Sequence, residues 1–125
     1  MVFGTSLRVA ADRTQPLNRR VTSLSKAVEK FGPMGFHRTF DHLYRATGAS
    51  HGTWTSDQVD TAVDLLRDAH DSWHAYSQAA RQDAHERKSE PGYRPLRIGE
   101  VFEAWWSSYF VDERRHSWRL DEPES

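Results

Sequence analysis

His70 and His74 are the residues of this chain best spaced to bind a metal ion. They stand four positions apart in a segment without glycine or proline, so a helix would place both imidazoles on adjacent turns of one face. Zinc sites on helices use this spacing, but no glutamate follows His70 to act as a base, and the third ligand cannot be identified. The simpler interpretation is a polar edge of the core, with His70 hydrogen-bonded to a neighbouring helix. We therefore predict that the chain binds no metal ion and no cofactor. If it does bind a metal ion, His70 and His74 are the candidate ligands.

Five aspartates step by three or four along the opposite side of the same segment. They are Asp57, Asp60, Asp64, Asp68 and Asp71. The helix dipole favours acids in the first turn, but like charges one turn apart beyond it cost about 0.2–0.5 kcal/mol per pair. The row is interpreted as a solvated face, as a docking surface for a basic partner or a second copy of the chain, or as a mimic of nucleic-acid phosphates. For a functional role we assign the last four of these aspartates to a protein interface.

The net charge of the chain is positive in its first half and negative in its second half. Residues 1–52 carry eight Lys and Arg against three Asp and Glu, whereas residues 53–125 carry nine against fifteen. Two helices joined by the breaker cluster at 32–35 would have the outline of a helix-turn-helix, whose second helix enters the major groove of DNA. The candidate DNA contacts are Arg19, Arg20, Lys26, Arg38, His42 and Arg45. An ordinary helical hairpin explains the same pattern, and the pI of 6.6 is low for a DNA-binding domain.

The densest aromatic block covers residues 105–110. Four apolar residues in and before it share a narrow arc of a helix and are predicted to be core: Ile98, Phe102, Trp105 and Tyr109. Trp106 falls at the margin of that arc, Phe110 outside it, and Trp118 nearly opposite. Large rings are favoured at interfaces, so these three are assigned to a protein interface. Their burial within the chain, by a helix that bends or ends, is the alternative.

Helices must position all of these groups. Apolar spacings of three and four predict four helices, over about residues 17–31, 35–47, 56–88 and 98–115. The third is the longest because no breaker interrupts it, and Thr55 with Gln58 has the spacing of a capping box at its start. Residues 1–15 lack a sustained period, so we predict a flexible amino-terminal arm there. A single helical domain over 16–120 and an acidic tail over 121–125 complete the predicted organisation.

Composition limits the class of protein. A chain of 125 residues is expected to form one domain, and its 12% aromatic content indicates a lean, aromatic-rich core. The absence of cysteine excludes disulfides and thiolate metal sites. No apolar run reaches the ~18 residues of a membrane span, and the first residues do not read as a secretory signal. We therefore expect a cytoplasmic protein that does not interact with a membrane.

These observations predict an all-α, small four-helix bundle-like domain with one long central helix. No motif for catalysis is found, since Ser107 and Ser108 lack a glycine elbow and Glu100 and Glu103 are placed as surface carboxylates. The expected function is that of a non-enzymatic interaction protein, such as a subunit, inhibitor or adaptor that binds a protein partner. The alternative is a helix-turn-helix-like DNA-binding regulator that uses the basic half of the chain.

Overall fold

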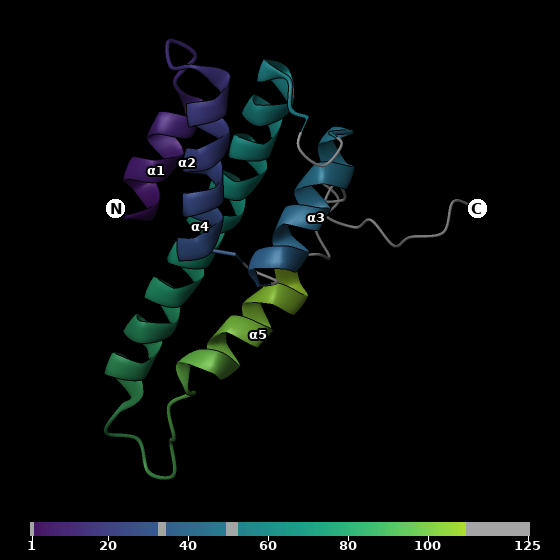
Figure 1. Ribbon diagram of the computed structural model, residues 1–125. Coiled ribbons are helices and arrows are strands. Elements are labelled where there is room, and N and C mark those ends of the chain that lie inside the picture. The colour runs from purple at the N-terminus through teal and green to yellow at the C-terminus, as the bar shows by residue number, and fades with distance from the viewer. Residues whose placement is uncertain (1, 33–34, 50–52, 110–125) are drawn as a thin grey trace, which may run out of the picture.

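The computed structural model describes residues 2–32, 35–49 and 53–109. These residues form five α-helices (Figure 1), namely α1 (Phe3–Ala11), α2 (Leu17–Lys30), α3 (Phe36–Thr47), α4 (Ser56–Arg87) and α5 (Ile98–Tyr109). The all-α class and the single long helix are confirmed. The described helices other than α1 begin and end close to the predicted positions, except that α5 is described only as far as Tyr109.

Helix α4 runs for 32 residues and is the element against which the other helices pack. Its start is fixed by the predicted capping box. The backbone N–H of Gln58 donates to the Thr55 hydroxyl at 3.2 Å, and the backbone N–H of Thr55 donates to the Gln58 side-chain carbonyl at 2.9 Å. These bonds give partners to two backbone N–H groups at the start of α4, which the helix itself cannot satisfy.

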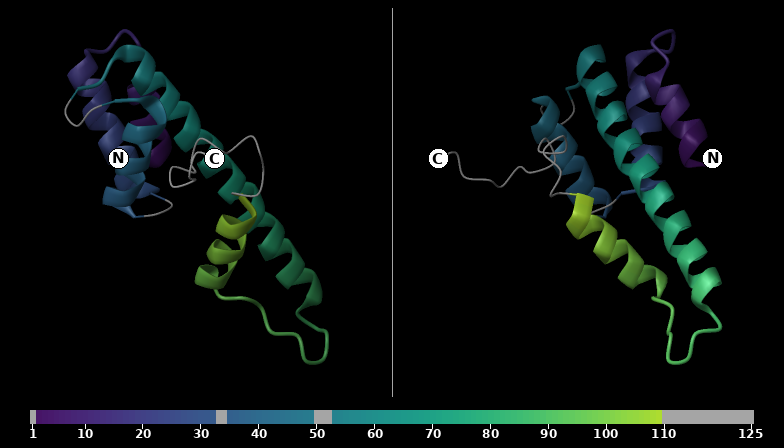
Figure 2. Two further views of the ribbon diagram at one scale, coloured as in Figure 1. Left: turned by 90° about the vertical axis from the view of Figure 1, so that its right-hand side faces the viewer. Right: turned by 180° about the vertical axis from the view of Figure 1, so that it is seen from behind.

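The other four helices pack along different parts of α4. In Figures 1 and 2, α1 and α2 lie beside its amino-terminal half, α3 lies along the other side of that half, and α5 runs beside its carboxy-terminal half. Leu24, Leu43 and Leu66 are completely buried where α2, α3 and α4 meet. Trp105 of α5 is also buried and belongs to the same apolar cluster.

The predicted flexible arm over residues 1–15 is wrong for most of its length. Residues 3–11 form α1, which packs on α2 and α4 and buries Leu7 and Ala10. Phe3, Leu7 and Ala10 follow a helical spacing, but the small and polar residues between them conceal it. Burial against two other helices stabilises a nine-residue helix that would be marginal alone.

The carboxy-terminal half of α4 is much less covered than its amino-terminal half. Tyr76 is 37% exposed, and no residue of α4 after Ser77 is buried. Ile98, predicted to be core, is 64% exposed at the start of α5. Among the described residues, α5 and the loop before it are the segments that accompany this part of α4 (Figure 2), and they leave much of it uncovered. None of the described helices has an apolar stretch suited to crossing a membrane.

Candidate protein-interaction site

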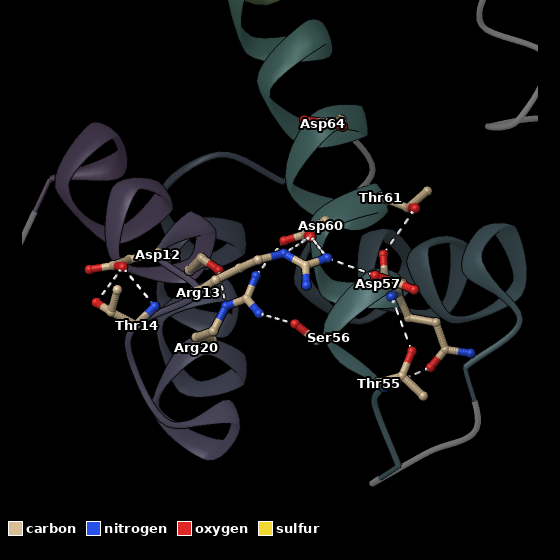
Figure 3. Close-up of polar contacts among 12 residues, drawn as sticks. Asp12, Arg13, Thr14, Arg20, Thr55, Ser56, Asp57, Asp60, Thr61 and Asp64 are labelled. Atoms are coloured by element: carbon tan, nitrogen blue, oxygen red, sulfur yellow. Dashed lines mark hydrogen bonds and ion pairs between the residues drawn. The ribbon is translucent and has the colours of Figure 1, made fainter.

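Two arginines from outside α4 bind the first aspartates of its acidic row (Figure 3). Arg13 donates to Asp57 at 2.6 Å and to Asp60 at 2.8 Å. Arg20 of α2 also donates to Asp60, and it reaches the carbonyl oxygen of Ala10 at 2.8 Å and the hydroxyl of Ser56 at 2.6 Å. Arg20 therefore joins the end of α1, α2 and the start of α4 in one polar cluster.

The polar cluster around Arg20 contains one residue that was predicted to contact DNA and one that was predicted to contact a protein partner. Arg20 is 1% exposed, so its prediction as a DNA contact is wrong. Asp60, assigned to the acidic interface, pairs with two arginines of its own chain. Burial alone would raise the pKa of Asp60, but the hydrogen bonds from Arg13 and Arg20 outweigh burial and lower that pKa below its ordinary value. Asp60 is therefore a charged structural residue.

The remaining aspartates of the row lie further along α4 and are exposed. Asp64 is 3.9 Å from Arg67 of the next turn. Asp68 accepts a hydrogen bond of 2.8 Å from the Tyr109 hydroxyl. Asp71 is 75% exposed and lies 3.9 Å from the His70 ring. Of the four aspartates assigned to the interface, Asp64, Asp68 and Asp71 thus remain on the exposed surface.

Two of these aspartates line a groove between α4 and α5. The groove has a volume of about 610 Å³. Its lining residues are Asp68, Asp71, Ser72, Ala75, Tyr76, Trp105, Ser108 and Tyr109. The two aspartates are the charged residues of this lining. Its aromatic residues are Tyr76, Trp105 and Tyr109. We call this site the acidic groove.

Hydrogen bonds between α4 and α5 hold the aromatic wall of the acidic groove in place. Trp105 donates from Nε1 to the Ser72 hydroxyl at 2.9 Å, and its ring packs 5.1 Å from the Tyr109 ring, centroid to centroid. Tyr109 is itself anchored on Asp68. Because both rings are buried and bonded, the wall is formed before any partner arrives.

Of the predicted interface aromatics, only Trp106 lies in the described part of the chain. It is half-buried, and its ring is stacked with those of Phe102 and Tyr109. It does not line the acidic groove. Phe110 and Trp118 lie outside the described residues. Tyr76, which the sequence analysis did not select as a functional residue, is 37% exposed and lines the groove.

The predicted DNA-contact residues do not form one continuous exposed set. His42 is 7% exposed, so its prediction as a surface contact is wrong, like that of Arg20. Arg19, Lys26, Arg38 and Arg45 are exposed. Arg45 lies 3.7 Å from Asp41 of the preceding turn, so a carboxylate adjoins one of the remaining cations.

His70 anchors the beginning of α1 on α4. Its ring is stacked on Phe3 at a centroid distance of 4.1 Å and meets Phe31 edge-on at 5.0 Å. Burial lowers the pKa of His70, and neighbouring His74 acts in the same direction, whereas Asp71 opposes both. His74 is exposed, and the two imidazole centroids are 6.5 Å apart. Across residues 2–32, 35–49 and 53–109, no three histidine or acidic side chains are grouped closely enough to hold a metal ion.

The lowered pKa of His70 predicts a loss of stability on acidification. The unfolded chain binds a proton at this position more tightly than the folded protein, so the free energy of unfolding falls as the pH drops below about 6.5. The loss ends once the pH is below the folded pKa. Urea unfolding of the wild type and of His70→Gln at several pH values between 8 and 5 measures it. The stability advantage of the wild type over the variant should shrink as the pH falls, and a constant difference would contradict the assignment.

Comparisons with known proteins do not assign this chain to a family. No protein-family model matches it, and neither the curated proteins nor the solved structures contain a significant match.

Proposed function

We propose that this protein is a non-enzymatic interaction protein that binds a basic segment of a partner protein in the acidic groove. The observation that supports this most directly is the composition of the groove lining. Asp68 and Asp71 supply negative charge, while Tyr76, Trp105 and Tyr109 supply aromatic surface within the same 610 Å³. A cationic side chain is the group that interacts favourably with both.

Arginine matches this lining better than lysine. Its planar guanidinium donates to a carboxylate through two parallel N–H groups and also stacks on aromatic rings. Asp71 and Tyr76 both line the groove, Asp71 is exposed, and Tyr76 is 37% exposed. An arginine that entered would therefore pair with Asp71 and lie against the Tyr76 ring. The wall formed by Trp105 and Tyr109 would not need to reorganise, which reduces the ordering cost of binding.

The proposal is tested with a short amidated peptide of alternating glycine and arginine, titrated into the protein by calorimetry at low salt. Asp71→Asn should weaken binding about two- to fivefold, since an exposed ion pair contributes about 0.2–1 kcal/mol. Tyr76→Ala should weaken it by a similar factor through loss of the cation–ring contact. Both side chains are exposed enough that the fold should be retained, which circular dichroism checks.

Glu103→Gln is the matched control, because Glu103 is an exposed carboxylate of α5 outside the groove lining. It removes the same charge and should leave affinity nearly unchanged. If Asp71→Asn and Glu103→Gln lowered the affinity for the peptide equally, the binding would be nonspecific charge attraction, and the proposal that the peptide binds in the acidic groove would be refuted. The DNA-binding alternative predicts a different pattern. Duplex DNA would bind with a steep salt dependence, and Arg38→Glu with Arg45→Glu would abolish that binding.

A further inference from the structure

A second groove lies at the far end of α4, where the loop that joins α4 to α5 folds back on the helix. Its volume is about 460 Å³. The lining residues are Ser77, Ala80, Arg81, Asp83, Ala84, Arg87, Gly92, Tyr93, Arg94, Leu96 and Val101. Gly92 has a φ of +79°, a left-handed conformation that glycine adopts readily and that turns the chain here. We call this site the distal groove; it shares no lining residue with the acidic groove.

One arginine of the distal groove is used to shape its wall. Arg87 donates from Nε to Glu90 at 2.7 Å, lies 3.7 Å from Asp83, and places its guanidinium 4.4 Å from the centre of the Tyr93 ring. Asp83 is the one acidic residue of the lining and already faces Arg87. The Tyr93 ring is therefore held against the helix, and the local acids are paired.

The other two arginines, Arg81 from α4 and Arg94 from the loop, are exposed. Among the described residues, neither makes a hydrogen bond or an ion pair. They line the groove together with Arg87 against a single aspartate, which leaves the lining with an excess of positive charge. Two guanidinium groups without partners at one cavity are a recognition element for an anion, carboxylate in particular.

The rest of the distal groove is apolar. Ala80, Ala84 and the buried Val101 contribute hydrocarbon from the two helices. Leu96 of the loop is 57% exposed, and Tyr93 also lines the groove. Exposed aliphatic groups next to unpaired cations favour a ligand that carries an anionic head on a hydrocarbon chain. The volume lies within the range of roughly 300–1,000 Å³ that is typical of small-molecule sites.

We propose that the distal groove binds a medium-chain carboxylic acid. Arg81 and Arg94 pair with the carboxylate, and the hydrocarbon chain covers Leu96, Val101 and the alanine face of α4. This proposal is independent of the acidic groove, because it depends on other residues and on a ligand of opposite charge.

The test is calorimetric titration of the full chain with octanoate, compared with octan-1-ol and acetate. Octanoate should bind saturably, whereas the alcohol lacks the anion, acetate lacks the chain, and both should bind at least tenfold more weakly. Arg81→Gln and Arg94→Gln should each weaken octanoate binding about two- to fivefold, the loss expected for one exposed ion pair. Leu96→Asp should abolish it. All three positions are exposed, so the fold should persist.

Arg38→Gln is the matched control, since Arg38 is an exposed arginine on α3, away from the distal groove. Its affinity for octanoate should equal that of the wild type. The proposal is overturned if octan-1-ol binds as tightly as octanoate, if inorganic phosphate does so, or if Arg38→Gln has the same effect as Arg81→Gln. Saturable binding of an acidic peptide without binding of octanoate would also overturn it, and would make this surface a protein contact.

Discussion

Replacing Arg20 by methionine is expected to lower the free energy of unfolding by about 3 kcal/mol. Removing one partner of a buried ion pair typically costs about 3–5 kcal/mol, because the other charge stays buried without compensation. Here Asp60 is partly exposed and keeps Arg13, which places the loss near the lower end. The carbonyl of Ala10 and the hydroxyl of Ser56 lose a donor as well. Urea denaturation followed by circular dichroism measures the change.

Arg19→Met is the matched control for this prediction. Arg19 precedes Arg20 in α2 and is exposed, so the same substitution there should change stability by less than about 0.5 kcal/mol. Equal effects of the two variants would show that the buried cluster does not contribute to stability. The lowered pKa of Asp60 adds a second readout. The stabilisation from its ion pairs is present above the ordinary aspartate pKa and is lost as the pH falls below it, so Arg20→Met should be less sensitive to acid.

Trp105→Ala is expected to lower the free energy of unfolding by about 3–5 kcal/mol, the usual cost of deleting a large buried ring. Trp105 is 1% exposed, and its ring contacts those of Phe31, Trp73 and Tyr109. The contact with Phe31, which follows α2, links α5 to the helices at the other end of the molecule. Hydrogen exchange should show that the amides of α5 lose protection first, because α4 is the main element that holds it.

Ser72→Ala separates the hydrogen bond of Trp105 from its packing. This substitution leaves the indole in place and removes only its acceptor, so the loss should be near 1 kcal/mol. If Trp105→Ala were no worse than Ser72→Ala, the packing contribution would be refuted. If Trp105→Ala also abolished binding of the arginine peptide while Ser72→Ala preserved it, the ring would be required to form the acidic groove.

Local patterns in the sequence predicted α4 correctly because the signals there are strong and independent of context. Thr55 and Gln58 are three residues apart, and that spacing alone produces a capping box at a helix start. The absence of glycine and proline allows 32 residues to continue without a break. Helix α1 was missed because its few apolar residues acquire meaning only when α2 and α4 cover them.

The sequence showed which residues of α4 carry a charge, but it did not show which of those charges pair within the protein. The spacing of the aspartates correctly placed Asp64, Asp68 and Asp71 on an exposed side of α4. It could not show that Arg20, 40 residues before Asp60, would be buried against it. It also could not show that Tyr109, 41 residues after Asp68, would donate to that carboxylate. Such pairs form between helices that are distant along the chain, so no local period reports them.

The order of residues along this chain therefore determined helices α2 to α5, the capping box of α4 and the positions of the charged residues, since these depend on neighbours within one or two turns. Tertiary packing alone decided which charges are neutralised internally and which remain at the acidic and distal grooves. The physical reason is that α5 covers only part of the second half of α4. An aromatic ring or an arginine on that half is buried or exposed according to where the covering helix and its loop come to lie.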